Sequence, residues 1–190
     1  LGVRPRSGWS IDPFGHSPVI SHLAQRCGIK GEVINRIHYS LKRELAISKA
    51  LEFHWTPHWD SAAVELASTS STTEKNLPGL FTHVLPFFAY DIPHTCGPEP
   101  RICARYDFTM VGQNSLWGEL VDRVTDQNVV QKAKDLANQY RLKAMLFRTN
   151  NVLIPLGYDF SYTDASHLQA QMSSYQRLFD IINANKDAYN

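Results

Sequence analysis

The chain alternates short apolar runs with longer segments in which apolar residues recur at helical spacing. Four apolar runs predict strands, at residues 8–12, 32–39, 80–90 and 151–157. Helical spacing predicts four helices, over residues 18–27, 40–53, 125–145 and 165–185. Near-continuously apolar strands that alternate with amphipathic helices are typical of a parallel sheet covered on both faces. The pattern therefore predicts an α/β fold, a parallel sheet with flanking helices.

The clearest element boundaries are those of the first helix. Ser17 and Pro18 fit an N-cap and a first helical position. Gly28 fits the residue that ends a helix.

Two stretches lack a regular pattern. Residues 68–76 (STSSTTEKN) are polar and of low complexity, which predicts an exposed insertion loop. Residues 93–118 are punctuated by proline and glycine, which predicts irregular structure. Neither stretch is typical of a linker, so we expect residues 1–190 to form one segment of a single domain without an internal boundary.

Composition excludes some classes of protein. The chain has 190 residues, 43% of them hydrophobic and 19% charged, which is usual for a globular domain. The net charge of +1 gives no basic surplus for nucleic acid. No apolar run reaches the roughly 20 residues that cross a bilayer, and no signal peptide is evident. The way the sequence begins and stops predicts a segment of a longer protein.

Carboxylates follow three of the predicted strands. They are Asp12, Asp91 and Asp159, of which the last two follow Tyr90 and Tyr158, while Arg36 interrupts the run 32–39. Because the carboxyl ends of neighbouring parallel strands meet at one rim, we expect these side chains to share a site. Paired carboxylates suit glycoside hydrolysis, and they also suit metal binding. The alternative is that each aspartate only caps the helix or turn that follows it.

Other candidates for chemistry are weaker. His54 and His58 have the spacing of a helical zinc pair, but Pro57 lies between them, and we interpret them as structural. His16 and His94 follow carboxylates, so they are either hydrogen-bonding partners of these groups or ordinary turn and core residues. The chain has no glycine-rich phosphate loop and no GxSxG motif.

The three cysteines divide into a pair and a single residue. Cys96 and Cys103 flank a turn containing proline and glycine, so they either form a short-loop disulfide or remain free thiols. Cys27 lies on the apolar side of the first predicted helix, and we expect a buried free thiol there.

Five motifs together resemble glycoside hydrolase family 38, and within it the Golgi α-mannosidase II type. They are GWSIDPFGHSP, RIHYSLKREL, LFTHVLPFFAYDIPHTCGPEP, TDQNVV and FRTNNVLIPLGYDF. The resemblance runs from about residue 7 to residue 182, and YDIPHTCGP is its most specific part.

This resemblance implies a retaining, zinc-dependent α-mannosidase that removes α-1,3- and α-1,6-linked mannose from N-linked glycans in the Golgi lumen. Asp12 matches the nucleophile, which is also a zinc ligand, and Asp159 matches the general acid/base. Positions that line the family's active site match Phe14, Arg36, Tyr90, Asp91 and Tyr158. The resemblance also implies a disulfide between Cys96 and Cys103. The implied partner is a mannose-containing N-glycan, and no nucleic acid is expected.

The chain departs from the family pattern in two ways. Golgi-type members usually carry Asp-Asp in the acid/base segment, whereas this chain has Tyr158–Asp159. The family's other zinc ligands come from a His-x-Asp motif upstream and a histidine downstream of the segment matched here. The implied fold is thus part of a seven-stranded β/α barrel, truncated at both ends, and we expect the isolated 190 residues to be inactive and prone to aggregate.

Two other interpretations stay open at this point. One is a lysosomal-type or broad-specificity α-mannosidase. The other is a secreted, non-catalytic carbohydrate-binding α/β module. For the enzyme of Golgi type, the full-length parent is expected to be a type II membrane protein, anchored outside this segment, and the sequence does not indicate its oligomeric state.

Overall fold

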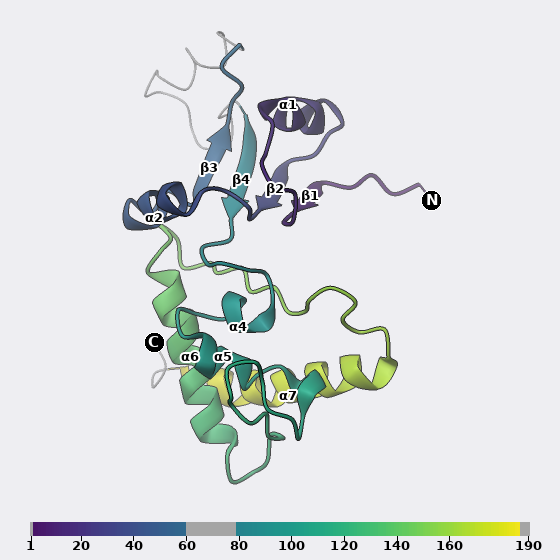
Figure 1. Cartoon of the computed structure of the whole chain (residues 1–190), viewed down its shortest axis with the longest axis vertical. Coiled ribbons are helices and arrows are strands. Elements are labelled where there is room, and N and C mark those ends of the chain that lie inside the picture. Colours follow the sequence, from purple (N-terminus) through teal and green to yellow (C-terminus); the bar gives the residue numbers. More distant parts are fainter. Residues whose placement is uncertain (1, 60–78, 187–190) are drawn as a thin grey trace. The chain divides into compact units, whose positions relative to one another are not determined.

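A computed structural model describes residues 2–59 and 79–186, so the predicted loop at 68–76 lies outside the described residues. The chain divides into two compact units, Leu1–Pro86 and Phe87–Asn190, and each is described by itself (Figure 1). This division by compactness does not test the expectation of a single domain segment, which stays a prediction.

The first unit is built on a four-stranded sheet. Its strands are β1 (Ser7–Ser10), β2 (Gly31–Ile34), β3 (Glu52–Trp55) and β4 (Leu80–Val84). The order is β1-β2-β4-β3; β1, β2 and β4 are parallel, and β3 pairs with β4 in the antiparallel sense. The α/β class is confirmed, but the sheet is mixed rather than all parallel. The four strands of the described residues do not show a seven-stranded barrel.

The two helices of this unit begin close to where the sequence predicts. Helix α1 spans Pro18–Arg26, and the Ser17 hydroxyl accepts a hydrogen bond from the backbone N–H of Val19 at 3.3 Å. Gly28 follows with a φ of 88°, a left-handed conformation that favours glycine after a helix. Cys27 is free as expected, but it is exposed, so the prediction of a buried thiol is wrong.

The second helix and the strand after it correct the sequence interpretation. Helix α2 spans Tyr39–Ile47, whereas we predicted a helix over 40–53. Lys49, with a φ of 54°, turns the backbone out of the helix, and residues 52–55 then pair with β4. Pairing with a distant strand overrides the local helical pattern here.

Two predicted strands of this unit are shorter than their apolar runs. Strand β2 ends at Ile34, and β4 ends at Val84 instead of continuing to residue 90. Leu85 still donates its N–H to the carbonyl of Ile34, at 2.9 Å, but the next residue, Pro86, has no N–H to continue the ladder.

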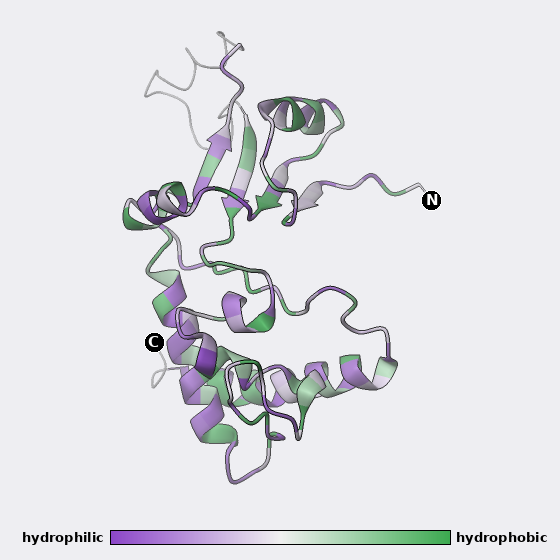
Figure 2. Cartoon of the chain, viewed as in Figure 1, coloured by the Kyte–Doolittle hydropathy of each residue, from purple (hydrophilic) through white to green (hydrophobic). Residues whose placement is uncertain are grey.

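The second unit is helical. Its elements are α4 (Ile92–Thr95), α5 (Pro100–Ala104), the 3₁₀ helix η2 (Phe108–Met110), α6 (Val129–Ala144) and α7 (Ala165–Ala184). Helices α6 and α7 confirm two predicted helices, and both carry apolar and polar residues (Figure 2). The buried residues of α6 include Lys132, Gln139 and Lys143 as well as apolar residues. Tyr106, Leu136 and Leu178 lie fully buried in the core. Among the described residues, no helix is both long and apolar enough to cross a membrane.

Two predictions fail in this unit. The region 93–118 contains α4, α5 and η2, although we expected it to be irregular. The predicted strand at 151–157 is not a strand. Side-chain donors take the place of strand neighbours there, because Lys143 and Thr95 bind the carbonyl oxygens of Leu153 and Pro155. An apolar run favours burial, but it forms a strand only where another strand lies beside it.

The disulfide between Cys96 and Cys103 is confirmed. Their Cα atoms are 5.7 Å apart, and both residues are fully buried in the core of the second unit.

We expect the double substitution Cys96→Ser, Cys103→Ser to lower the free energy of unfolding by about 2–3 kcal/mol, since the bond closes a short loop in the unfolded chain. Urea unfolding of the protein measures this loss. The control is Cys27→Ser, an exposed free thiol, for which we expect a change of less than about 0.5 kcal/mol. An equal effect of both changes would contradict the stabilising role of the disulfide.

A pH dependence of stability follows from Lys143. Burial lowers the pKa of this amine from the ordinary value of 10.5 to about 7. Between these values the unfolded chain binds a proton that the folded chain has released, so this group makes stability rise with pH. We expect a contribution of up to about 1 kcal/mol per pH unit above pH 7. Urea unfolding at pH 7, 8 and 9 should show this slope in the wild type and not in Lys143→Met. Identical slopes in the two proteins would contradict the assignment.

Candidate functional site

The parallel register of β1 and β2 brings Asp12 and Arg36 together. Ser10 and Ile34 are partners across the two strands, and each strand is followed two residues later by one of the charged side chains. Arg36 donates to Oδ1 of Asp12 from both Nε, at 3.1 Å, and Nη2, at 2.9 Å. The pair lies at the carboxyl ends of parallel strands, where sequence reasoning expected it. The prediction that Arg36 lies within a strand is wrong, because β2 ends at Ile34.

Phe14 and Lys42 complete the surroundings of Arg36. The guanidinium carbon of Arg36 lies 5.3 Å from the centre of the Phe14 ring, and that ring is largely exposed. Lys42 donates to the side-chain oxygen of buried Asn35, at 2.9 Å. Burial, and then the charge of Arg36, lower the pKa of Lys42 to about 8. The Asp12 carboxylate therefore lies against the positive charge of Arg36.

An apolar cavity of about 560 Å³ adjoins this pair. Its lining includes Arg36, His16 and Leu41, together with Phe53 from β3. Burial lowers the pKa of His16, so this ring is held neutral more readily than in water.

In the second unit, Tyr90 holds Asp159. The hydroxyl of Tyr90 donates to Oδ1 of Asp159 at 2.9 Å. The rings of Tyr90 and Tyr158 lie 5.7 Å apart, with Tyr90 buried and Tyr158 exposed. Neither Tyr90 nor Asp159 follows a strand directly, contrary to the prediction: Tyr90 precedes α4, and Asp159 follows the extended segment 151–157.

Asp91 has a different partner. Its Oδ1 lies 2.5 Å from Nδ1 of His94, one turn further along α4. The sequence offered this histidine as a candidate partner of a carboxylate, and the structure confirms it. The His94 ring also contacts the rings of Phe88 and Trp117, at 5.7 and 5.5 Å between centres. Sequence reasoning did not find Trp117, since it lies far along the chain and in no recognised motif.

The alternative that the three aspartates serve only as caps is wrong. Asp12 binds Arg36, Asp159 accepts from Tyr90, and Asp91 binds His94 without a side-chain cap to α4. The structure thus forms an Asp12 group in the first unit and an Asp159 group in the second. That these groups share one rim stays a prediction.

The chemistry of Asp12 fits a single metal ligand. Its side chain is 51% exposed, and the hydrogen bonds from Nε and Nη2 of Arg36 use one oxygen, Oδ1. A carboxylate oxygen is a suitable ligand for zinc, but such a site normally needs three protein ligands. Among the described residues, no group of three or more histidine, cysteine, aspartate or glutamate side chains could hold a metal ion. The described residues therefore do not supply the three protein ligands of such a site, and further ligands would have to come from elsewhere in the longer protein.

An α/β chain with one carboxylate held by an arginine and another held by a tyrosine is compatible with a glycoside hydrolase, and comparison with known proteins identifies the family. Residues 1–190 match the family described as glycosyl hydrolases family 38, N-terminal domain. The chain belongs to this family.

Its relatives are mannosidases. The chain is 41% identical to human alpha-mannosidase 2 over 187 residues, which are 97% of this chain and 15% of that protein. It is 43% identical to alpha-mannosidase 2 of Arabidopsis thaliana over 189 residues, again 97% of this chain and 15% of that protein. Lysosomal alpha-mannosidase of Dictyostelium discoideum is 32% identical over 189 residues, with coverage of 100% and 16%. The chain thus spans about one-sixth of the length of these relatives.

Proposed function

We propose that the protein containing this chain is a retaining α-mannosidase, and that this chain supplies its nucleophile and its acid/base. The observation that carries the proposal is the Asp12–Arg36 pair at the ends of two parallel strands, in a chain of family 38. The isolated segment is expected to be inactive, because the described residues do not supply the three protein ligands that a zinc site normally needs.

Asp12 acts as the nucleophile. Oδ1 is held by two N–H groups of Arg36, which fixes the orientation of the carboxylate and stabilises its charge. A carboxylate so oriented can attack the anomeric carbon of a bound mannoside and form a glycosyl-enzyme intermediate, which water then hydrolyses.

Asp159 acts as general acid and then as general base. It protonates the oxygen of the leaving group in the first step and accepts a proton from water in the second. The hydrogen bond from Tyr90 orients its carboxyl group, and that bond uses only one of its two oxygens. Asp91 and Phe14 are proposed to bind sugar hydroxyls and ring faces.

Zinc is proposed as the cofactor, with Asp12 as the ligand from this chain. When bound, it would gather sugar hydroxyls and polarise bonds at the reacting sugar. The remaining ligands would come from other parts of the full-length protein.

The proposed substrate is a mannose-containing N-linked glycan, with α-1,3 and α-1,6 linkages, processed in the Golgi lumen. The alpha-mannosidase 2 relatives, at up to 43% identity, support this more strongly than the lysosomal relative at 32% supports a lysosomal enzyme. Golgi-type members usually carry aspartate at the position of Tyr158. We therefore expect this tyrosine to change the substrate preference of the sugar site.

The test uses the full-length protein with an aryl α-mannoside and a GlcNAc-bearing high-mannose glycan, each with and without a chelator. We expect release of mannose from both, faster from the glycan, and loss of activity after chelation that added Zn²⁺ restores. Absence of activity toward both substrates would favour a non-catalytic carbohydrate-binding module. Activity that resists chelation would contradict the proposed cofactor.

A further inference from the structure

A buried lysine lies in the core of the second unit. Lys143, in the last turn of α6, is fully buried. Its Nζ donates to the carbonyl oxygens of Thr95 and of Leu153, each at 2.7 Å. Among the described residues, the structure gives Lys143 no ion pair. Burying an amine without a charged partner costs free energy, so stability alone does not explain why a lysine occupies this position.

Thr95 adds a second connection between the same two segments. Its hydroxyl donates to the carbonyl oxygen of Pro155 at 2.7 Å. Thr95 ends the short helix α4, which begins just after Tyr90 and Asp91. Leu153 and Pro155 lie in the extended segment that leads directly to Asp159. The three hydrogen bonds therefore join the segment that carries Tyr90 to the segment that carries Asp159.

These bonds stand in for a strand partner. The segment 151–157 belongs to no helix or strand, so its carbonyl groups need hydrogen-bond donors other than a neighbouring strand. Two carbonyl acceptors match the two protons of a neutral amine, and an ammonium offers one proton more. Lys143 can thus hold both segments in either protonation state.

We propose that Lys143 and Thr95 are positioning residues for the acid step: they hold the Asp159 segment in register with α4, so that the Tyr90 hydroxyl meets the Asp159 carboxyl group. This inference rests on the proposed function, in which Asp159 is the general acid. Loss of either connection should let the Asp159 segment shift, which weakens protonation of the leaving group while Asp12 stays intact.

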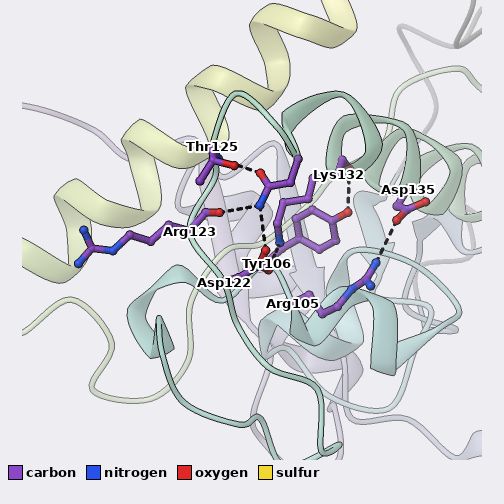
Figure 3. Close-up of polar contacts among 8 residues, drawn as sticks. Arg105, Tyr106, Asp122, Arg123, Thr125, Lys132 and Asp135 are labelled. Atoms are coloured by element: carbon purple, nitrogen blue, oxygen red, sulfur yellow. Dashed lines mark hydrogen bonds and ion pairs between the residues drawn. The ribbon is translucent and has the colours of Figure 1, made fainter.

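The same helix offers a matched control. Lys132 is also buried in α6, but its Nζ pairs with Asp122 at 2.7 Å and lies over the ring of Tyr106 (Figure 3). The same Nζ lies 5.8 Å from the centre of the Phe108 ring. Within the described part of the chain, its contacts with Asp122, Tyr106 and Phe108 reach neither α4 nor residues 151–157. Lys132→Met therefore disturbs the core of the second unit without cutting the proposed connection.

The experiment measures kcat/KM of the full-length protein on two aryl α-mannosides. Phenyl α-mannoside needs protonation of its leaving group, whereas 2,4-dinitrophenyl α-mannoside does not, because dinitrophenolate leaves readily as an anion. For Lys143→Met we expect a loss of about 10- to 100-fold on the phenyl substrate, part of what a general acid contributes, and less than about threefold on the dinitrophenyl substrate. Lys132→Met should change both values by the same factor.

A second pair of variants covers the case in which Lys143→Met does not fold. Thr95→Val removes the hydroxyl and should lower kcat/KM on the phenyl substrate alone, while Thr95→Ser keeps the hydroxyl and should restore it. Equal losses on both substrates, or the same substrate dependence in Lys132→Met, would overturn the positioning role while leaving the proposed function in place. A wild type that hydrolyses neither substrate would overturn the proposed function and this inference together.

Discussion

Asp12→Asn is expected to abolish α-mannosidase activity of the full-length protein, with kcat/KM lowered at least about 10³-fold. The amide keeps the shape of the side chain and an oxygen that Arg36 can bind, but it cannot attack the anomeric carbon. Loss of the proposed metal ligand adds to the effect. The measurement is the initial rate on phenyl and dinitrophenyl α-mannosides, and both should fall, because the nucleophile is needed whatever the leaving group.

The control for this change is Asp180→Asn on α7. Asp180 is an exposed aspartate that accepts a hydrogen bond from Gln176, one turn earlier on the helix, at 2.8 Å. We expect its kcat/KM to stay within about twofold of the wild type, as for most surface changes. If Asp12→Asn kept more than a tenth of the wild-type activity, Asp12 would not be the nucleophile.

Asp159→Ala should have a large effect of a different kind. Without a general acid, kcat/KM should fall about 10²- to 10⁴-fold on phenyl α-mannoside but much less on dinitrophenyl α-mannoside. Azide should then accelerate turnover by attacking the glycosyl-enzyme intermediate, which gives α-mannosyl azide with retained configuration. In Asp12→Ala, azide would replace the nucleophile itself and give the β-mannosyl azide.

The stereochemistry of the azide product therefore separates the two roles. Proton NMR of the product, or digestion with an α-specific mannosidase, identifies the anomer. A β product from Asp159→Ala, or an equal loss of activity on both aryl mannosides, would show that Asp159 is not the acid/base.

Local signals predicted the elements whose stability is local. The Ser17 cap, Pro18 and Gly28 located α1, and helical spacing located α6 and α7. A cap or an amphipathic face is formed by residues close in the chain, so its pattern can be read there.

Elements that depend on distant partners could not be predicted in this way. Strand β3 forms because residues 52–55 pair with β4, although their spacing continues that of a helix. The apolar run 151–157 is extended without becoming a strand, because Lys143 and Thr95 reach its carbonyl groups from elsewhere in the chain. Apolar character indicates burial, but the sequence of a segment does not identify the strand, helix or side chains that pack against it.

The candidate site shows the same difference between local signals and distant partners. The sequence predicted Asp12 and Arg36 at one rim, but it placed Arg36 inside the run 32–39 and did not predict the ion pair that the parallel register of β1 and β2 allows. The Tyr90–Asp159 bond joins residues far apart in sequence, which pattern alone does not pair. Lys143 gave no signal at all, because a lysine in an amphipathic helix normally lies on the exposed face.

The most direct test of the account is to trap the covalent intermediate on the full-length enzyme. A 5-fluoroglycosyl fluoride that mimics mannose has a good leaving group, and its ring fluorine slows release of the sugar from the nucleophile. Peptic digestion and tandem mass spectrometry then locate the added sugar. The account predicts a single modified peptide, with the sugar on Asp12. A sugar on any other carboxylate, or time-dependent inactivation without a covalent adduct, would contradict the assignment of Asp12 as the nucleophile.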